Sequence, residues 1–314
     1  MFYISADFDN YELFESSATK WNLDFKLISR DNFSAHLTLF TNDYFQIGRT
    51  SIQGTMEQNG LCPEGFRSIA IPYLNSSRFC WFNRNANTDN LLLFPEDGVI
   101  DSVSYNGFDV IVISIREDII YDTIEDLGLS NLEKLFNGVE QYLHQEEQFH
   151  KRIIYLSNQF FKFIKSFSKD SLHHQVTLEN KIHQIVHNTL IYLNSCRTNS
   201  KNYQERKRDH ALSLVVDYIQ NHLKDAIRID QLCRNANVSE RTLDYAFKEK
   251  YEVSPIEYIK AIKLNEVKKE LLKSNDQLIS SIAAKYGFWH MGQFAADFRK
   301  RFGELPSEVQ KSRA

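Results

Sequence analysis

Short apolar runs separated by turn residues fill roughly the first 120 residues of the chain. Such runs occupy residues 36–40, 68–71, 91–95 and 109–115, and Asn-Gly or Asp-Gly pairs stand between several of them. Runs of four to eight residues with these pairs between them are typical of antiparallel sheets. The pattern predicts an all-β N-terminal domain over residues 1–120, built as a sandwich or a barrel.

The spacing of apolar residues changes to a helical period between about residues 121 and 200. Three stripes carry this period: Leu132, Leu135, Phe136, Val139, Tyr142 and Leu143; Ile153, Leu156, Phe160, Phe163, Ile164 and Phe167; and Ile182, Ile185, Val186, Thr189, Leu190 and Leu193. They predict amphipathic helices that pack on the β domain or on a second subunit. The polar residues 197–202 then predict a linker.

The most informative pattern is an internal repeat between residues 229 and 309. At an offset of 50, Leu232 matches Ile282, Cys233 matches Ala283, Asn237 matches Gly287 and Val238 matches Phe288. At an offset of 51, Leu243 matches Phe294, Phe247 matches Phe298, Lys248 matches Arg299, Tyr251 matches Phe302 and Pro255 matches Pro306. One residue inserted in the turn explains the change of offset.

Each copy of the repeat has the pattern of a helix-turn-helix unit. A small residue, Cys233 or Ala283, lies inside the first helix, where a bulkier side chain would hold the second helix away. Four residues later stand Asn237 and Gly287, the residue types that best tolerate a positive φ. A long apolar pattern over residues 254–273 predicts one helix that joins the two units.

This ordered signature resembles the C-terminal DNA-binding domain of AraC/XylS-type transcription regulators, over about residues 207–312. The residues that carry the resemblance are Val238, Ser239, Arg241, Leu243, Phe247, Lys248, Leu264, Ser281, Ile282, Ala283, Gly287, Phe288, Gln293, Phe294, Phe298, Arg299, Phe302, Gly303 and Pro306. Residues 287–294 also resemble, more weakly, regulators of amine catabolism such as the ethanolamine operon activator. Lys263 and Ala296 depart from the family pattern, which often has Arg at these places.

The resemblance implies an α+β chain with three parts. These are an effector-sensing β domain at residues 1–120, a helical dimerisation and linker region at 121–200, and a DNA-binding domain at 201–314. It also implies that the chain forms a homodimer, responds to a small-molecule effector and binds double-stranded DNA. If the chain activates transcription, as is the habit of the family, RNA polymerase is a further partner.

The second helix of a helix-turn-helix unit presents its N-terminal residues to base edges, while flanking donors hold phosphates. We expect base readout from Ser239, Glu240, Arg241, Thr242, Tyr245, His290, Met291, Gln293 and Asp297. We expect phosphate contacts from Lys248, Lys285, Arg299, Lys300 and Arg301. Arg241 suits guanine, Glu240 suits cytosine and Gln293 suits adenine. A salt-bridged scaffold role for Arg241 and a merely solvated basic face stay open, and Trp289 is expected to pack rather than to contact bases.

The net charge of −4 hides an asymmetry along the chain. Residues 201–314 carry 21 Lys and Arg against 16 Asp and Glu, whereas residues 1–200 carry 16 against 25. A basic third on an acidic body suggests that this third contacts phosphate. A solvated helical surface can carry the same excess, so the charge supports the resemblance without establishing it.

The front domain offers little chemistry for a metal or for catalysis. His36 is the only histidine before His144, so a metal-bearing cupin is not expected, and we predict no catalytic residue, metal or cofactor. An anionic or aromatic effector could bind a pocket lined by Arg67, Arg78, Trp81 and Arg84. The alternation along residues 78–82 fits a strand with one buried face equally well.

Two other classes of protein stay open. A DNA repair enzyme with the same tail would need a zinc-binding cysteine cluster, and Cys62, Cys80, Cys196 and Cys233 lack that spacing. A helical interaction protein would not need Asn237 and Gly287 at matching offsets. We therefore expect a regulator that is not an enzyme. We also expect it in the cytoplasm, because the chain shows no apolar run of about 18 residues and no signal-peptide pattern at its start.

Overall fold

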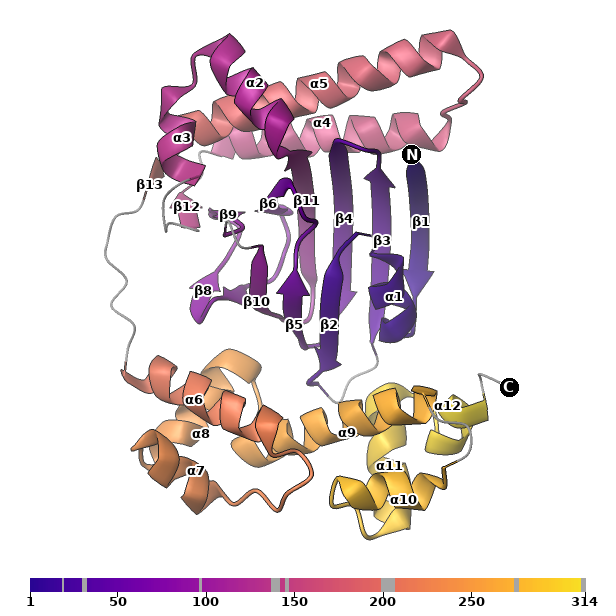
Figure 1. Ribbon diagram of the computed structural model, residues 1–314, viewed down its shortest axis with the longest axis vertical. Helices are drawn as coiled ribbons and strands as arrows, with labels where there is room; N and C mark the ends of the chain where they lie inside the picture. The colour runs from indigo at the N-terminus through magenta and orange to yellow at the C-terminus, as the bar shows by residue number, and fades with distance from the viewer. Residues whose placement is uncertain are drawn as a thin grey trace.

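The computed structural model describes residues 1–18, 20–29, 33–95, 98–136, 142–144, 147–198, 207–273 and 277–311. A β-rich domain carries a layer of helices at one end and rests on a separate helical domain at the other (Figure 1). The α+β class predicted from the sequence is confirmed. No helix within these ranges is both long and apolar enough to cross a bilayer.

Two antiparallel sheets and one short helix, α1 (Tyr11–Ser17), form the β domain. The larger sheet contains, in spatial order, β1 (Phe2–Phe8), β3 (Ser34–Thr41), β4 (Phe45–Gln53), β11 (Phe108–Arg116), β6 (Phe66–Pro72), β9 (Asn90–Leu93), β12 (Tyr142–His144) and β13 (Arg197–Thr198). The smaller sheet contains β2 (Asn22–Leu27), β5 (Met56–Leu61), β10 (Val99–Ser104), β7 (Phe79–Trp81) and β8 (Arg84–Ala86). Because side chains alternate along a strand, each sheet turns one face toward the other sheet and one face outward.

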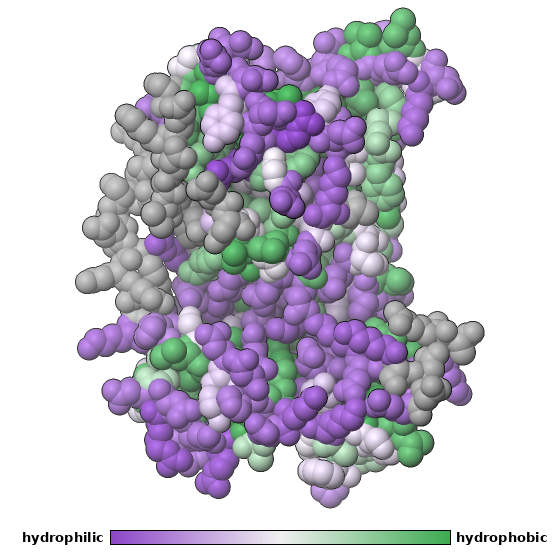
Figure 2. Space-filling model, in the orientation of Figure 1, coloured by the Kyte–Doolittle hydropathy of each residue, from purple (hydrophilic) through white to green (hydrophobic). Residues whose placement is uncertain are grey.

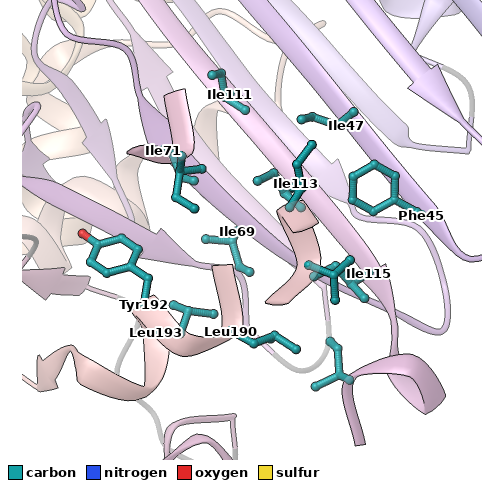
Figure 3. Packing of buried hydrophobic residues seen from close by; sticks show 14 of the residues in the cluster. Phe45, Ile47, Ile69, Ile71, Ile111, Ile113, Ile115, Leu190, Tyr192 and Leu193 are labelled. Atoms are coloured by element: carbon teal, nitrogen blue, oxygen red, sulfur yellow. The ribbon is translucent and has the colours of Figure 1, made fainter. Parts of the chain in front are cut away.

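Four helices cover the outward face of the larger sheet. They are α2 (Glu117–Leu127), α3 (Ser130–Phe136), α4 (Glu147–Lys165) and α5 (Leu172–Ser195). On β11, every second side chain points toward these helices. Ile111, Ile113 and Ile115 pack there with Leu190 and Leu193 of α5 in one buried cluster (Figure 3). The helical stripes predicted at residues 153–167 and 182–193 therefore face the sheet.

The first predicted stripe is only partly helical. Tyr142 and Leu143, expected on a helix, lie in β12 and pair with β9, so that Leu143 is opposite Leu91. The predicted linker also starts differently, because Arg197 and Thr198 pair with β12 as β13. These pairings satisfy backbone groups of β9 that would otherwise lie at the edge of the sheet, which local periodicity cannot reveal. Val139 and residues 199–202 lie outside the described residues.

The C-terminal domain consists of seven helices in the described ranges. They are α6 (Lys207–Asn221), α7 (Ile229–Ala236), α8 (Glu240–Tyr251), α9 (Pro255–Lys273), α10 (Ile279–Lys285), α11 (Met291–Phe302) and α12 (Pro306–Lys311). Two cores form, one around α6, α7 and α8 and the other around α10, α11 and α12. The joining helix α9 serves both, since Tyr258 and Ile262 pack in the first core and Leu264 and Val267 in the second.

The C-terminal domain packs against the smaller sheet through a buried interface. Ile28, Cys80, Val103 and Tyr105 of the β domain belong to the same apolar cluster as the core of α6 to α8. On the second unit, Phe302 packs against the core between the two sheets. Both helix-turn-helix units therefore contact the β domain.

Candidate nucleic-acid interface

The two predicted turns have the same backbone geometry. Asn237 is left-handed with φ 51°, and Gly287 has φ 85°. In both units the N–H of the next residue donates to the carbonyl of the small residue in the first helix, Cys233 at 3.0 Å and Ala283 at 3.1 Å. The turn positions predicted from the repeat are confirmed, and they set the angle at which the second helix leaves the first.

We call the second helix of each unit, α8 and α11, a reading helix. Ser239 caps α8, because its Oγ accepts a hydrogen bond from the N–H of Thr242 at 3.1 Å. His290 precedes α11 without a side-chain cap. The buried faces of the two helices are formed by Leu243, Phe247, Tyr251, Phe294 and Phe298. These residues fix which sides of the two helices face solvent.

The N-terminal halves of both reading helices are exposed. Ser239, Glu240, Arg241, Tyr245, His290 and Gln293 all have exposed side chains. Arg241 and Gln293 make no hydrogen bond to any residue in the described ranges. Tyr245 is 62% exposed and lies under the guanidinium of Arg208, with 5.2 Å from its ring centre to Cζ. These side chains are available to a ligand outside the domain.

Three of the expected base-reading residues are held by neighbours instead. The hydroxyl of Thr242 lies 2.8 Å from Ser239 Oγ, and Met291 packs at the edge of the second core. Asp297 is the clear correction, because its carboxylate forms an ion pair with Lys260 of the joining helix. Its side chain is only 19% exposed. Asp297 therefore holds α11 against α9 rather than facing a base.

Four of the five expected phosphate-binding residues are exposed: Lys248, Lys285, Arg299 and Lys300. Lys248 pairs with Asp244 of its own helix at 2.8 Å, and Lys285 pairs with Glu270. Arg299 and Lys300 form no ion pair with a residue in the described part of the chain. No carboxylate of the described residues neutralises the charge of these two cations.

Arg301 does not belong with them, and its expected phosphate role is corrected. The residue is 3% exposed, and its Nη1 donates to the carbonyls of Leu27 at 3.0 Å and Ser29 at 2.8 Å, and also to that of Ile28. Successive helix positions differ by about 100°. The turn that exposes Arg299 and Lys300 therefore points Arg301 at the β domain.

Trp289 is the candidate that sequence reasoning missed. It was expected to pack, yet its side chain is 74% exposed, immediately before α11. Phe288 already packs between the two helices of this unit, so there is no room for the side chain of Trp289 in the same place. The offset that matched Phe288 with Val238 was the signal that could have shown this.

The structure does not bring the three arginines of the expected effector site to the cavity between the two sheets. Arg67 is buried against Glu117, with Nε 3.0 Å from the carboxylate. Arg78 pairs across the domain interface with Glu252 at 2.6 Å. Neither they nor Arg84 lines the cavity between the two sheets, whereas Trp81 does. Alternation along residues 78–82 puts Phe79 and Trp81 on the inner face and Arg78 on the outer face.

The interface between the domains is rich in buried polar contacts. Glu57 of β5 is 2% exposed and accepts hydrogen bonds from the hydroxyl groups of Tyr251 at 3.3 Å and Tyr258 at 3.0 Å. Burial, before any other cause, holds the pKa of both tyrosines well above its usual value. Both hydroxyl groups therefore stay protonated and can donate hydrogen bonds to Glu57.

The sequence similarity to the family model and to the two relatives described here lies in about a third of the chain or less. Residues 232–312 match the family model described as a helix-turn-helix domain. Over 97 residues the chain is 33% identical to the probable thc operon regulatory protein of Rhodococcus erythropolis, covering 30% of this chain and 29% of that protein. Over 101 residues it is 35% identical to XylDLEGF operon transcriptional activator 3 of Pseudomonas putida, which covers 32% of this chain and 30% of that protein.

A crystal structure of a probable AraC family transcriptional regulator from Rhodopseudomonas palustris is also similar. It shares 29% identity with a TM-score of 0.32, and covers 33% of this chain and 96% of that chain. The matched region spans less than a third of the two curated relatives. The C-terminal part of this chain is an AraC-type helix-turn-helix domain, as the sequence resemblance implied.

Proposed function

We propose that the chain is a sequence-specific DNA-binding transcription regulator that reads two successive major grooves with α8 and α11. The observation that carries this proposal is the matched orientation of the two reading helices. Each has its N-terminal half exposed, while its C-terminal end packs toward the β domain through Tyr251 or Arg301. A duplex can approach the exposed ends of both helices without displacing the β domain.

The joining helix supports a fixed spacing between the two reading helices. α9 has 19 residues, which at 1.5 Å per residue corresponds to about 28 Å. Successive major grooves on one face of B-DNA lie about 34 Å apart. Because α9 contributes to both cores, the two reading helices keep one relative position. One chain then covers two half-sites.

The exposed side chains give each reading helix its proposed contacts. Arg241 can form two hydrogen bonds to guanine, and Gln293 can do the same with adenine. Arg299 and Lys300 supply charge for phosphates. The surface of the C-terminal domain in the view of Figure 2 is mostly hydrophilic, as an interface with DNA requires.

The rest of the chain has roles that complete the proposal. The β domain senses a small-molecule effector, and the layer of α4 and α5 forms a homodimer. Tyr155, Leu172 and Val176 are exposed apolar residues on these two helices, 61%, 74% and 53% accessible. The regulator acts in the cytoplasm as an activator that contacts RNA polymerase.

Selection of genomic fragments tests the proposal. The purified chain is mixed with fragments at about physiological salt, and the retained DNA is sequenced. We expect a few sequences to be enriched, and retention of all fragments alike would contradict the proposal. Arg241→Ala should cost about 1–3 kcal/mol and relax specificity at one base pair. Arg152→Ala, an exposed arginine on α4, is the matched control and should change neither.

A further inference from the structure

The space between the two sheets contains a partly open cavity of about 110 Å³. Leu39 and Val110 of the larger sheet and Phe25, Trp81 and Ile100 of the smaller sheet line it. An apolar cavity of about 150 Å³ in another protein holds benzene and stays dry without it. The size and lining of this cavity therefore suit one molecule about as large as a single aromatic ring.

The residues that line the cavity also determine whether it favours a charged or an uncharged ligand. No Asp, Glu, Lys, Arg or His of the described chain is among them. The polar side-chain groups are amides, hydroxyls and the N–H groups of two indoles, and both amides already form hydrogen bonds: Gln46 accepts from Trp21 Nε1 at 3.1 Å, and Gln58 donates to Ser104 Oγ at 2.8 Å. An ionised ligand would lose its hydration without gaining an opposite charge, which is costly. The cavity favours an uncharged molecule.

The smaller sheet lies between the cavity and the C-terminal domain. One of its faces lines the cavity, and the other contacts that domain. On β5, Gln58 faces the cavity, while its neighbour Glu57 faces the other way and accepts from Tyr251 and Tyr258. Of these two consecutive residues, Gln58 therefore contacts the cavity and Glu57 contacts the C-terminal domain. A movement of this strand that makes room for a ligand also moves Glu57.

Two more strands repeat this arrangement. On β2, Phe25 faces the cavity and its neighbour Asp24 pairs with Lys269 of α9. On β10, Asp101 pairs at 3.4 Å with Lys250, which lies near the end of the first reading helix. The outward residues of three adjacent strands therefore hold the reading helix α8 and the joining helix α9.

We propose that this cavity binds a compact, uncharged, apolar molecule of about one aromatic ring, and that its occupancy changes DNA affinity through the smaller sheet. The second half of the proposal rests on the proposed regulator function, whereas the class of ligand does not. Ligand binding and DNA binding are therefore measured separately, so that failure of one is distinguished from failure of the other.

Toluene and benzoate form a matched pair of probes, because a methyl group on the same ring replaces a carboxylate. Thermal unfolding of the full chain is followed with each probe in a sealed cell. Toluene near ten times its Kd should raise Tm by about 2–4 °C. Benzoate at the same concentration should leave Tm unchanged. No rise with toluene, or an equal or larger rise with benzoate, overturns the proposed class of ligand.

Filling the cavity tests the location of the site. Ala70→Leu from the larger sheet and Ser102→Leu from the smaller sheet add bulk to the cavity from opposite sides. Either variant should abolish the Tm rise with toluene. If either of them does not fold, the smaller substitution Ala70→Val is measured in its place. Ala226→Leu, at an exposed position in the C-terminal domain, is the control and should keep the rise. A full rise in a folded cavity variant places the site elsewhere and overturns the proposal.

The coupling is tested with a DNA fragment recovered by the genomic selection. The Kd for this fragment should change about fivefold or more when toluene saturates the chain. An unchanged Kd with a clear Tm rise overturns the coupling and leaves the class of ligand standing. Absence of selective DNA binding with and without toluene counts against the proposed function instead.

Discussion

The side-chain amide of Asn265 pairs with both backbone groups of Leu27. Its Oδ1 accepts from the Leu27 N–H at 3.0 Å, and its Nδ2 donates to the Leu27 carbonyl at 3.0 Å. Both residues are 0% exposed. A residue of the joining helix thus completes the hydrogen bonding of the last residue of β2, much as a neighbouring strand would. Because Arg301 donates to the same carbonyl, the end of β2 is tied to the joining helix and to the second reading helix.

Replacement of Asn265 by Ala should lower the free energy of unfolding by about 2–4 kcal/mol. The substitution leaves the buried Leu27 N–H without a partner, which costs about 1–3 kcal/mol, and it removes one of the two donors to the Leu27 carbonyl, which costs about 1 kcal/mol more. Urea denaturation measures the loss. Asn221→Ala, where the amide donates to the Asp217 carbonyl on an exposed helix surface, is the control and should cost under about 1 kcal/mol. Equal losses in the two variants would show that the pairing with Leu27 contributes little.

Arg299 and Arg301, two residues apart on α11, should give opposite results when replaced by Ala. Arg299→Ala should make the dependence of log K on log salt shallower by about one and leave stability nearly unchanged. Arg301→Ala should lower stability by about 2–4 kcal/mol, because two buried carbonyls and one partly buried carbonyl lose a charged donor. Its salt dependence should stay that of the unaltered chain, and a shallower slope in a folded Arg301→Ala variant would restore the phosphate role.

Lys268 should be important for holding α9 to both of its neighbours. Its ammonium group, 2% exposed, lies 3.0 Å from Glu12 of the β domain and 2.9 Å from Glu304 after α11. Lys268→Met should cost about 2–4 kcal/mol, since two partly buried carboxylates lose their counter-charge. Adding Glu12→Gln to that variant should recover part of the loss in urea denaturation. Lys273→Met, at the exposed end of the same helix, should be nearly neutral, and a similar cost at both lysines would rule out the ion pairs as the cause.

Cys80 should make stability depend on pH above about 9. Burial, the largest cause, raises the pKa of its thiol to about 11 from an ordinary value of 9.0. The folded chain resists forming the thiolate, so this stability is complete below pH 9 and is lost as the pH rises toward 11. Near pH 10.5 the loss amounts to about 2 kcal/mol.

The pH prediction is measured as the difference between the unaltered chain and Cys80→Ala, which cancels the other groups that titrate in this range. Urea denaturation at pH 8 and at pH 10.5 gives the two differences. The advantage of the unaltered chain over Cys80→Ala should shrink by about 2 kcal/mol between these values. A constant difference would mean that the thiol is solvated in the folded chain.

The helix-turn-helix units were predictable because their signals are local. Asn237 and Gly287 are needed for a turn that spans a few residues, and the repeat shows the same need twice. The roles of Arg299 and Arg301 could not be separated in the same way. Both are basic residues near the end of one helix, and only the position of the β domain buries one of them.

The β domain shows the same division between local and distant causes. Alternation predicted strands in the first 120 residues, and the strands are there, but it does not say which face meets which neighbour. Arg78 could therefore be read as a ligand-binding residue, although its partner is Glu252, 174 positions away. β12 was misread as helix for the same reason, because β9, its pairing partner, lies about fifty residues earlier in the chain.

Hydroxyl-radical footprinting of the full chain on a selected fragment tests the central claim most directly. The claim is that one chain reads two successive major grooves with α8 and α11. The account predicts two protected segments on one face of the duplex, with centres about 10 base pairs apart. Arg241→Ala should weaken protection in one segment and Gln293→Ala in the other. Protection of a single segment, or loss of the same segment in both variants, would contradict the account.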